Sequence, residues 1–175
     1  EHDPTLQAHP HRWMALWFIC LTILISTLDM TTLNVALPQI SRDLHASTTE
    51  LQWIIDSYTL VLAAFLLLVG GLGDRYGRRG AFVSGAALFG LATVGASMSR
   101  SPEQLIIARS VMGLGAAMFM PAALSLIAVL FPPAERSRAL LVWIWAGSIG
   151  TAGGPVVAGL LVDKFGWGSV FLVTV

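Results

Sequence analysis

Residues 13–36 read WMALWFICLTILISTLDMTTLNVA, an almost unbroken apolar run. The run exceeds the roughly 20 residues that a helix needs to cross the hydrocarbon core of a bilayer. Its one charged side chain is the carboxylate of Asp29. A charge at such a depth is costly in lipid, so it usually faces the interior of a helix bundle or a water-filled cavity. The run therefore predicts a membrane-spanning helix with a polar face.

Four further apolar runs have similar lengths and predict four more membrane spans. They occupy residues 51–72, 80–98, 102–131 and 139–162. A last apolar stretch, FGWGSVFLVTV at 165–175, looks like the start of a sixth span. Because lipid cannot satisfy free backbone groups, all of these segments should be helical. The sequence thus predicts an all-α integral membrane fold, with a cytoplasmic tail at 1–12 and an incomplete transmembrane lobe at 13–175.

The composition agrees with a membrane protein and excludes several function classes. Of the 175 residues, 55% are hydrophobic and 11% are charged, and the mean hydropathy is +0.75. Soluble domains carry about 25% charged residues. The zero net charge offers no basic surface for nucleic acid, and no histidine lies within the predicted spans. We therefore expect membrane lipid as the surroundings, no nucleic-acid partner, no metal site, no histidine-ligated haem and no Ser–His protease dyad.

Basic residues near the span ends predict the orientation, because cytoplasmic loops carry an excess of Lys and Arg. One side of the predicted topology holds six of these residues and the other side three. The larger group consists of Arg12, Arg75, Arg78, Arg79, Arg136 and Arg138, and the smaller of Arg42, Arg100 and Lys164. The N-terminus is therefore expected in the cytoplasm, in a multi-pass protein of the cell membrane (an inner or plasma membrane).

Three charged residues lie deep within the predicted spans, away from the span ends, namely Asp29, Asp56 and Arg109. The predicted topology puts all three at similar depth in the outer half of the membrane. Thr22 and Ser26 share a helix face with Asp29, and this face would line a polar cavity. The alternative is a static ion pair that fixes helix packing. Two acids against one base leave one acid unpaired, which a purely structural site would avoid, and this favours a functional site.

A short loop between the second and third predicted spans reads GGLGDRYGRR at 70–79. Asp74 stands at a helix end beside three arginines, where a carboxylate can bind a guanidinium, and Gly77 permits a tight reversal of the chain. Contacts of this kind can form in one conformation and break in another, which makes the loop a candidate conformational latch. The latch residues are Gly70, Asp74, Arg75, Gly77, Arg78 and Arg79. The alternative is a positively charged loop that only sets topology.

The fifth predicted span carries two adjacent stripes of small residues. Such stripes let helix backbones approach closely, and a proline in their midst removes one helical hydrogen bond. The candidate residues for a tightly packed helix that can bend are Gly150, Gly154, Pro155 and Gly159. Tight packing without bending is the alternative.

Three aromatic residues within the predicted spans are candidates for stacking on an organic cation, because an aromatic face attracts positive charge. They are Tyr58, Trp143 and Trp145. The alternative is that each ring is an ordinary packing residue.

Four local patterns resemble those of one transporter family, the major facilitator superfamily. The loop at 70–79 matches its G-x-x-x-D-R-x-G-R-R/K pattern, and RSVMGLG at 109–115 is like its R-x-x-x-G-x-G element. LDMTTLNVALP at 28–38 is similar to the signature of the drug:proton antiporter branch, with Leu33 where valine is usual. GSIGTAGGPVVAG at 147–159 resembles the G-x-x-x-G-P-x-x-G antiporter motif.

The resemblance implies a secondary active transporter, not an enzyme, with about fourteen spans in two lobes. With its acid at Asp56, the second span resembles that of a subgroup that exports quaternary ammonium compounds and other lipophilic cations. The exporters of this subgroup are multidrug efflux proteins that confer antibiotic resistance. This chain would supply most of the N-terminal lobe and need a C-terminal lobe as its partner. The proton gradient would drive export by antiport, without a cofactor.

The resemblance also implies roles for single residues. Asp29 would carry both the proton and the exported cation, with Arg109 beside it, and Asp56 would add a second charge for divalent or larger cations. The latch would open and close as two lobes rock around a midplane site, while the fifth span seals a proton leak. Two alternatives stay open: a transporter of another small solute, and a non-transporting membrane fragment or split-gene half that needs a partner.

Overall fold

The computed structural model describes the backbone of residues 11–172, and the side chains of these residues except 70–76 and 163. This part of the chain consists of helices joined by short turns and contains no strand. The helices are α1 (Arg12–Asp43), α2 (Thr48–Tyr76), α3 (Arg78–Ser97), α4 (Pro102–Leu130), α5 (Pro133–Phe165) and α6 (Gly168–Leu172). The predicted all-α fold is confirmed.

Five of the helices in the described part, α1 to α5, are long and apolar enough to cross a membrane, which confirms the five predicted spans. Two of them extend well past the predicted apolar runs: α1 continues through Pro38 to Asp43, and α5 begins at Pro133. Hydropathy marks only the part of a helix that lies in lipid, so turns in the headgroup layer or in water escape it. Pro133 suits the start of α5 because the first turn of a helix needs no backbone N–H donor.

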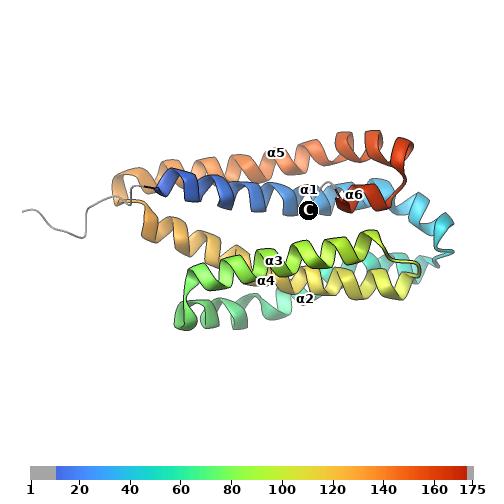
Figure 1. The fold of residues 1–175 in the computed structure, drawn as a ribbon, viewed down its shortest axis with the longest axis horizontal. Coiled ribbons are helices and arrows are strands. Elements are labelled where there is room, and N and C mark those ends of the chain that lie inside the picture. Colours follow the sequence, from blue (N-terminus) through green and yellow to red (C-terminus); the bar gives the residue numbers. More distant parts are fainter. Residues whose placement is uncertain (1–10, 173–175) are drawn as a thin grey trace, which may run out of the picture.

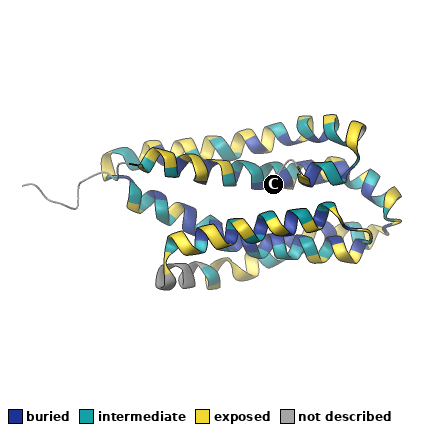
Figure 2. Cartoon of the chain, in the orientation of Figure 1, coloured by how far each residue is buried: buried dark blue, intermediate teal, exposed yellow. Residues whose placement is uncertain are grey.

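The helices form two groups that lie side by side (Figure 1). In the first group α1 packs along α5, and in the second group α4 packs against both α2 and α3. Helix α1 touches α2 and α4 at few places, and the short α6 lies against both groups, on α3 and on α5. Helix α4 is the most buried of the five candidate spans, and buried positions follow its whole length (Figure 2).

Glycines allow the close helix contacts of the second group. Gly85 of α3 and Gly115 of α4 face each other, and a Cβ at either position would lie 2.8 Å from the carbonyl oxygen of the other. At Gly113 of α4, a Cβ would collide with the Tyr58 backbone of α2. The two α4 glycines therefore bring α2 and α3 against α4, and Gly113 does so one turn after Arg109.

The turn between α2 and α3 is a single residue, Gly77, with a φ of 110°. A side chain would strain the backbone in this region, and glycine enters it freely. The tight reversal that the sequence predicts at Gly77 is thus confirmed.

Candidate functional site

Asp29 of α1 and Arg109 of α4 form a buried ion pair. The Arg109 Nη1 atom donates to Asp29 Oδ2 over 2.5 Å, and the exposed fractions of the two side chains are 2% and 0%. Both residues point away from solvent in helices that otherwise touch little. The pair is therefore the main polar link that the structure describes between the α1–α5 group and the group of α2, α3 and α4.

Helix α2 holds the Arg109 side chain from a second direction. The Arg109 Nε atom donates to the backbone carbonyl of Ile54 over 3.2 Å, and the guanidinium carbon lies 4.6 Å from the centre of the Tyr58 ring. Ile54 and Tyr58 are one helical turn apart, so they share the α2 face that meets α4. The close approach at Gly113 brings this face within reach of Arg109.

Hydroxyl groups complete the cluster on the α1 side. The Ser26 and Tyr58 hydroxyls form a hydrogen bond of 3.3 Å, and both residues are buried. Ser26 stands three residues before Asp29 and shares its face, as the sequence predicts. Thr22, the third residue predicted on that face, is partly exposed, and its hydroxyl donates to the Phe18 carbonyl of its own helix.

One carboxylate oxygen of the ion pair has no protein partner. Asp29 Oδ1 is buried and makes no hydrogen bond within the described residues, whereas Oδ2 binds Arg109. A buried acceptor without a donor is costly. The arrangement therefore leaves one oxygen of a carboxylate, deep in a helix bundle, available to a proton, a water molecule or a cationic ligand.

Asp56 does not join the cluster. Its side chain is exposed, and it has no hydrogen bond or ion pair within the part of the chain that the structure describes. Asp56 is two residues from both Ile54 and Tyr58, so it lies on the opposite side of α2 from the face that meets Arg109. The predicted set of Asp29, Asp56 and Arg109 is thus divided into a buried pair and a separate, exposed acid.

The three predicted stacking aromatics lie in different surroundings. The Tyr58 ring is fully buried and its face is covered by the Arg109 guanidinium, so that face is taken by a cation of the protein itself. Trp143 is partly buried, and its Nε1 atom has no hydrogen-bond partner among the described residues. Trp145 is 66% exposed. Tyr58 is therefore not proposed as a substrate-stacking residue.

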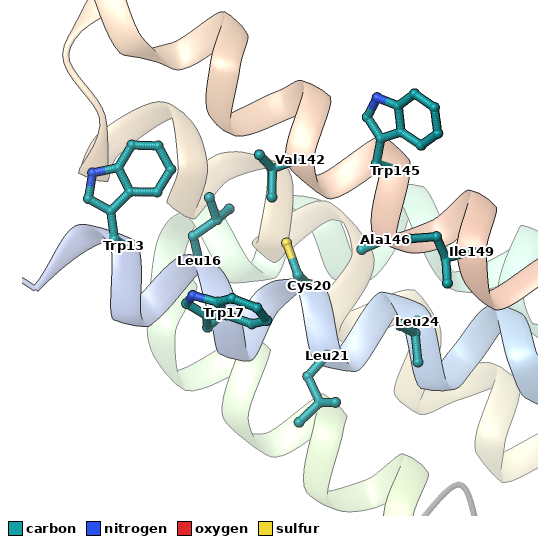
Figure 3. A pocket seen from close by; sticks show the side chains of 10 residues that line it. All are labelled: Trp13, Leu16, Trp17, Cys20, Leu21, Leu24, Val142, Trp145, Ala146 and Ile149. Carbon is teal, nitrogen blue, oxygen red and sulfur yellow. The ribbon is translucent and has the colours of Figure 1, made fainter.

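Trp145 borders an apolar pocket of about 520 Å³ between α1 and α5 (Figure 3). Figure 3 shows Trp13 and Trp17 extending from α1 and the Trp145 indole pointing away from α1. The pocket is lined by Trp13, Leu16, Trp17, Cys20, Leu21, Leu24, Val142, Trp145, Ala146 and Ile149. It contains no charged side chain, so it cannot by itself recognise a cation by charge.

The predicted latch lies partly outside the described side chains. Gly70, Asp74 and Arg75 belong to the stretch 70–76, for which only the backbone helix is described. Gly77 makes the turn, and Arg78 and Arg79 open α3 with partly exposed and exposed side chains. The contacts that a latch requires therefore stay a prediction.

Two of the four predicted small-motif residues of α5 pack tightly against α1. A Cβ at Gly150 would collide with the Thr27 hydroxyl and lie 2.5 Å from the Leu24 carbonyl oxygen. A Cβ at Gly154 would collide with the Thr31 side chain. The same addition at Gly159 would meet nothing within 4 Å, and Pro155 is exposed. The motif thus contains two glycines at the α1–α5 contact and two residues away from it.

Some partners in this site leave no signal in a single sequence. The Ile54 carbonyl is a backbone group that every residue has, so no residue type points to it. Thr27 and Thr31 bond to carbonyls of their own helix, as threonines in membrane helices often do. Their role as the surface that receives Gly150 and Gly154 depends on which helices pack together, which only the three-dimensional structure reveals.

Comparison with curated proteins finds relatives along nearly the whole chain. The multidrug efflux pump LfrA of Mycolicibacterium smegmatis is 42% identical over 177 aligned residues, which cover 100% of this chain and 35% of that protein. The methyl viologen resistance protein SmvA of Salmonella typhimurium is 44% identical over 94% of this chain and 33% of its own length. The chain therefore spans about a third of the length of the curated relatives it matches.

Solved structures support the fold. A bacterial homologue of the human lysosomal transporter Spinster, in an inward-facing and unoccupied conformation, matches 96% of this chain and 41% of that chain with a TM-score of 0.76. The two are 20% identical in sequence, so the likeness concerns the fold alone. The family model of the Major Facilitator Superfamily matches residues 19–175. With this match over most of its length, the chain belongs to the Major Facilitator Superfamily, a family of secondary transporters and not of enzymes.

Proposed function

We propose that this chain forms the N-terminal lobe of a proton-coupled antiporter that exports lipophilic and quaternary ammonium cations. The observation that carries the proposal is the buried Asp29 carboxylate, with one oxygen bound to Arg109 and the other without a partner in the described residues. A charge at this depth of a membrane bundle is a functional-site candidate by default. The names of the relatives, an efflux pump and a resistance protein, support drug export.

The proposed exchange needs one carboxylate with two competing ligands. When Asp29 is ionised, its free oxygen can attract a cation, and Arg109 keeps the buried charge from being unbalanced. When Asp29 takes a proton, its negative charge disappears and the cation loses its counter-charge. Protonation of Asp29 therefore releases the cation. This competition for one carboxylate is sufficient for antiport as the two lobes rock around a midplane site.

Asp56 supplies a second, separate negative charge in this proposal. Because it is exposed and has no ion pair in the described part, it is free to meet a second positive charge of a larger cation. Methyl viologen, which appears in the name of the SmvA relative, is an organic dication. An acid in this position would distinguish divalent from monovalent substrates.

The remaining predicted residues take supporting roles. The 70–79 loop would act as the cytoplasmic latch, and the tight α1–α5 contact at Gly150 and Gly154 would seal the bundle against proton leakage. Since the relatives are about three times longer, a second lobe would come from chain beyond these residues. The protein would lie in the cell membrane with its N-terminus in the cytoplasm, as the basic residues predict.

The test is efflux of a fluorescent cation, driven by a pH gradient, from vesicles that contain the full-length protein with Asp29→Asn. Export should be abolished, because the group for which proton and cation compete is gone. Asp43→Asn is the matched control, since Asp43 is an exposed acid at the end of the same helix, and it should export at the wild-type rate.

Asp29→Asn leaves Arg109 without its counter-charge, so rates are divided by the amount of folded protein measured by gel filtration. The double variant Asp29→Asn/Arg109→Met removes both buried charges and should be folded but inactive. Export by this double variant at the wild-type rate and pH dependence would refute the proposed coupling site.

A further inference from the structure

The Arg109 guanidinium lies between two groups that differ in their response to protons. On one side is the Asp29 carboxylate of α1, bound through Oδ2. On the other side, α2 contributes the Ile54 carbonyl at 3.2 Å and the Tyr58 ring at 4.6 Å. A proton on Asp29 weakens the first contact by removing its negative charge. Neither a backbone carbonyl nor the face of a phenol ring changes when Asp29 is protonated.

We propose that Tyr58 is a positioning residue for the exchange reaction: its ring holds Arg109 on α2, so that protonation of Asp29 frees α1 and leaves Arg109 in place. This inference rests on the proposed function, because it assumes that Asp29 exchanges a proton. It makes Tyr58 part of the coupling machinery without any contact to the exported cation.

The environment of Tyr58 fits a fixed support. The side chain is fully buried, and its backbone is packed against α4, where a Cβ on Gly113 would collide with it. The ring therefore has little freedom to turn away from Arg109. A cation over an aromatic face is attracted most strongly where water is excluded, and Arg109 is 2% exposed.

The helix packing indicates what the support achieves. Helices α2 and α4 pack closely against each other, whereas α1 meets α4 at few places. Arg109 stays with α2 and α4 if its hold on α2 survives protonation, and the weakened contact is then the one between the two helix groups. Without the Tyr58 ring, Arg109 could move with Asp29 of α1 or stay with α2. Protonation of Asp29 would then no longer weaken the contact between α1 and α4 selectively.

The experiment compares three substitutions in the full-length protein, reconstituted in vesicles with a fluorescent cation and a variable pH gradient. Tyr58→Leu removes the ring face and Tyr58→Phe keeps it while losing the hydroxyl. Phe89→Leu is the matched control, because Phe89 is also a buried aromatic in the bundle (3% exposed) and packs against Phe119 at the α3–α4 contact. Efflux rates are measured as kcat and KM over a range of pH, and thermal unfolding is measured in detergent.

We expect Tyr58→Leu to lower kcat about tenfold, the loss that a desolvated cation–π contact would give, with a smaller change in KM. Its pH profile should be displaced from that of the wild type, while Tyr58→Phe keeps both the rate and the profile. Phe89→Leu should unfold at a similarly lowered temperature, yet retain the wild-type pH profile. That comparison separates positioning from packing, because a purely structural role would give the two leucine variants the same profile.

Two results would overturn the inference while the proposed function stands. One is a Tyr58→Leu profile that superimposes on those of Phe89→Leu and the wild type after scaling by folded protein, and the other is an equal loss in Tyr58→Phe and Tyr58→Leu. In both cases Asp29→Asn still abolishes export. If Asp29→Asn exports normally, the proposed function itself is wrong. The Asp29→Asn result therefore separates a failure of the proposed function from a failure of the role inferred for Tyr58.

Discussion

At the scale of single residues, the stability of the bundle depends on how two opposite charges are buried together. Asp29 and Arg109 are each nearly inaccessible, and each is the other's counter-ion. Removing one member of such a pair leaves an uncompensated charge, which costs about 3–5 kcal/mol. Replacing both members by neutral groups of similar size is often close to neutral, because both desolvation penalties disappear together.

We therefore expect Arg109→Met alone to destabilise the full-length protein by about 3 kcal/mol and Asp29→Asn/Arg109→Met to recover most of that loss. The readout is the thermal unfolding midpoint in detergent. Additive losses in the double variant would mean that the two side chains do not compensate each other, contrary to the observed ion pair.

The sequence makes this pair easy to find and its surroundings hard to find. A charge stands out in an apolar run, so Asp29, Asp56 and Arg109 could all be selected as candidates. Which acid meets the base depends on helix rotation: Tyr58 faces Arg109, and Asp56, two residues away, faces the other side. Helix rotation also explains why the sequence suggests Tyr58 as a stacking residue for an organic cation. The sequence does not show that the Arg109 guanidinium already covers the ring.

At the scale of helices, the contact between α1 and α5 has almost no spare room at Gly150 and Gly154, beyond the apolar pocket near Trp145. Gly150 and Gly154 are pressed against Thr27 and Thr31, while Gly159, in the same motif, faces open space. Sequence periodicity predicts which residues form the small stripe, because small residues recur at helical spacing. It cannot say where along the stripe the neighbouring helix lies, because that depends on how the two helices cross.

Gly150→Ala and Gly154→Ala should therefore each destabilise the protein by about 1–3 kcal/mol, the usual range for overpacking a tight contact. Gly159→Ala serves as the control and should change stability by less than about 0.5 kcal/mol. Thermal unfolding in detergent measures all three. Equal destabilisation by Gly159→Ala would show that the stripe is sensitive for a reason other than contact with α1.

At the scale of the whole molecule, the orientation in the membrane decides what every other feature can do. The loops at the end of α1 and at the end of α4 lie at opposite ends of the bundle (Figure 1). Hydropathy predicted the five complete spans correctly. Successive spans joined by short loops must cross the membrane in opposite directions. The side that faces the cytoplasm comes only from the excess of arginines at one end.

Cysteine labelling tests this orientation in a full-length background without other cysteines. Thr49→Cys, an exposed position at the start of α2, should react with a membrane-impermeant thiol reagent added to intact cells. Ala134→Cys, an exposed position at the start of α5, should react only after permeabilisation. The opposite pattern would invert the topology and place the 70–79 loop outside the cell.

The separation of the ion pair along the chain has a consequence for biogenesis. Arg109 follows Asp29 by 80 residues, a stretch that takes roughly ten seconds to synthesise. During that interval the nascent α1 carries an acid without its counter-charge, and α5, its main packing partner, does not yet exist. Although α1 is synthesised before the other described helices, it is thus among the last of them to find its packing partner, and its early residence in the membrane depends on the insertion machinery or on a neutralising proton.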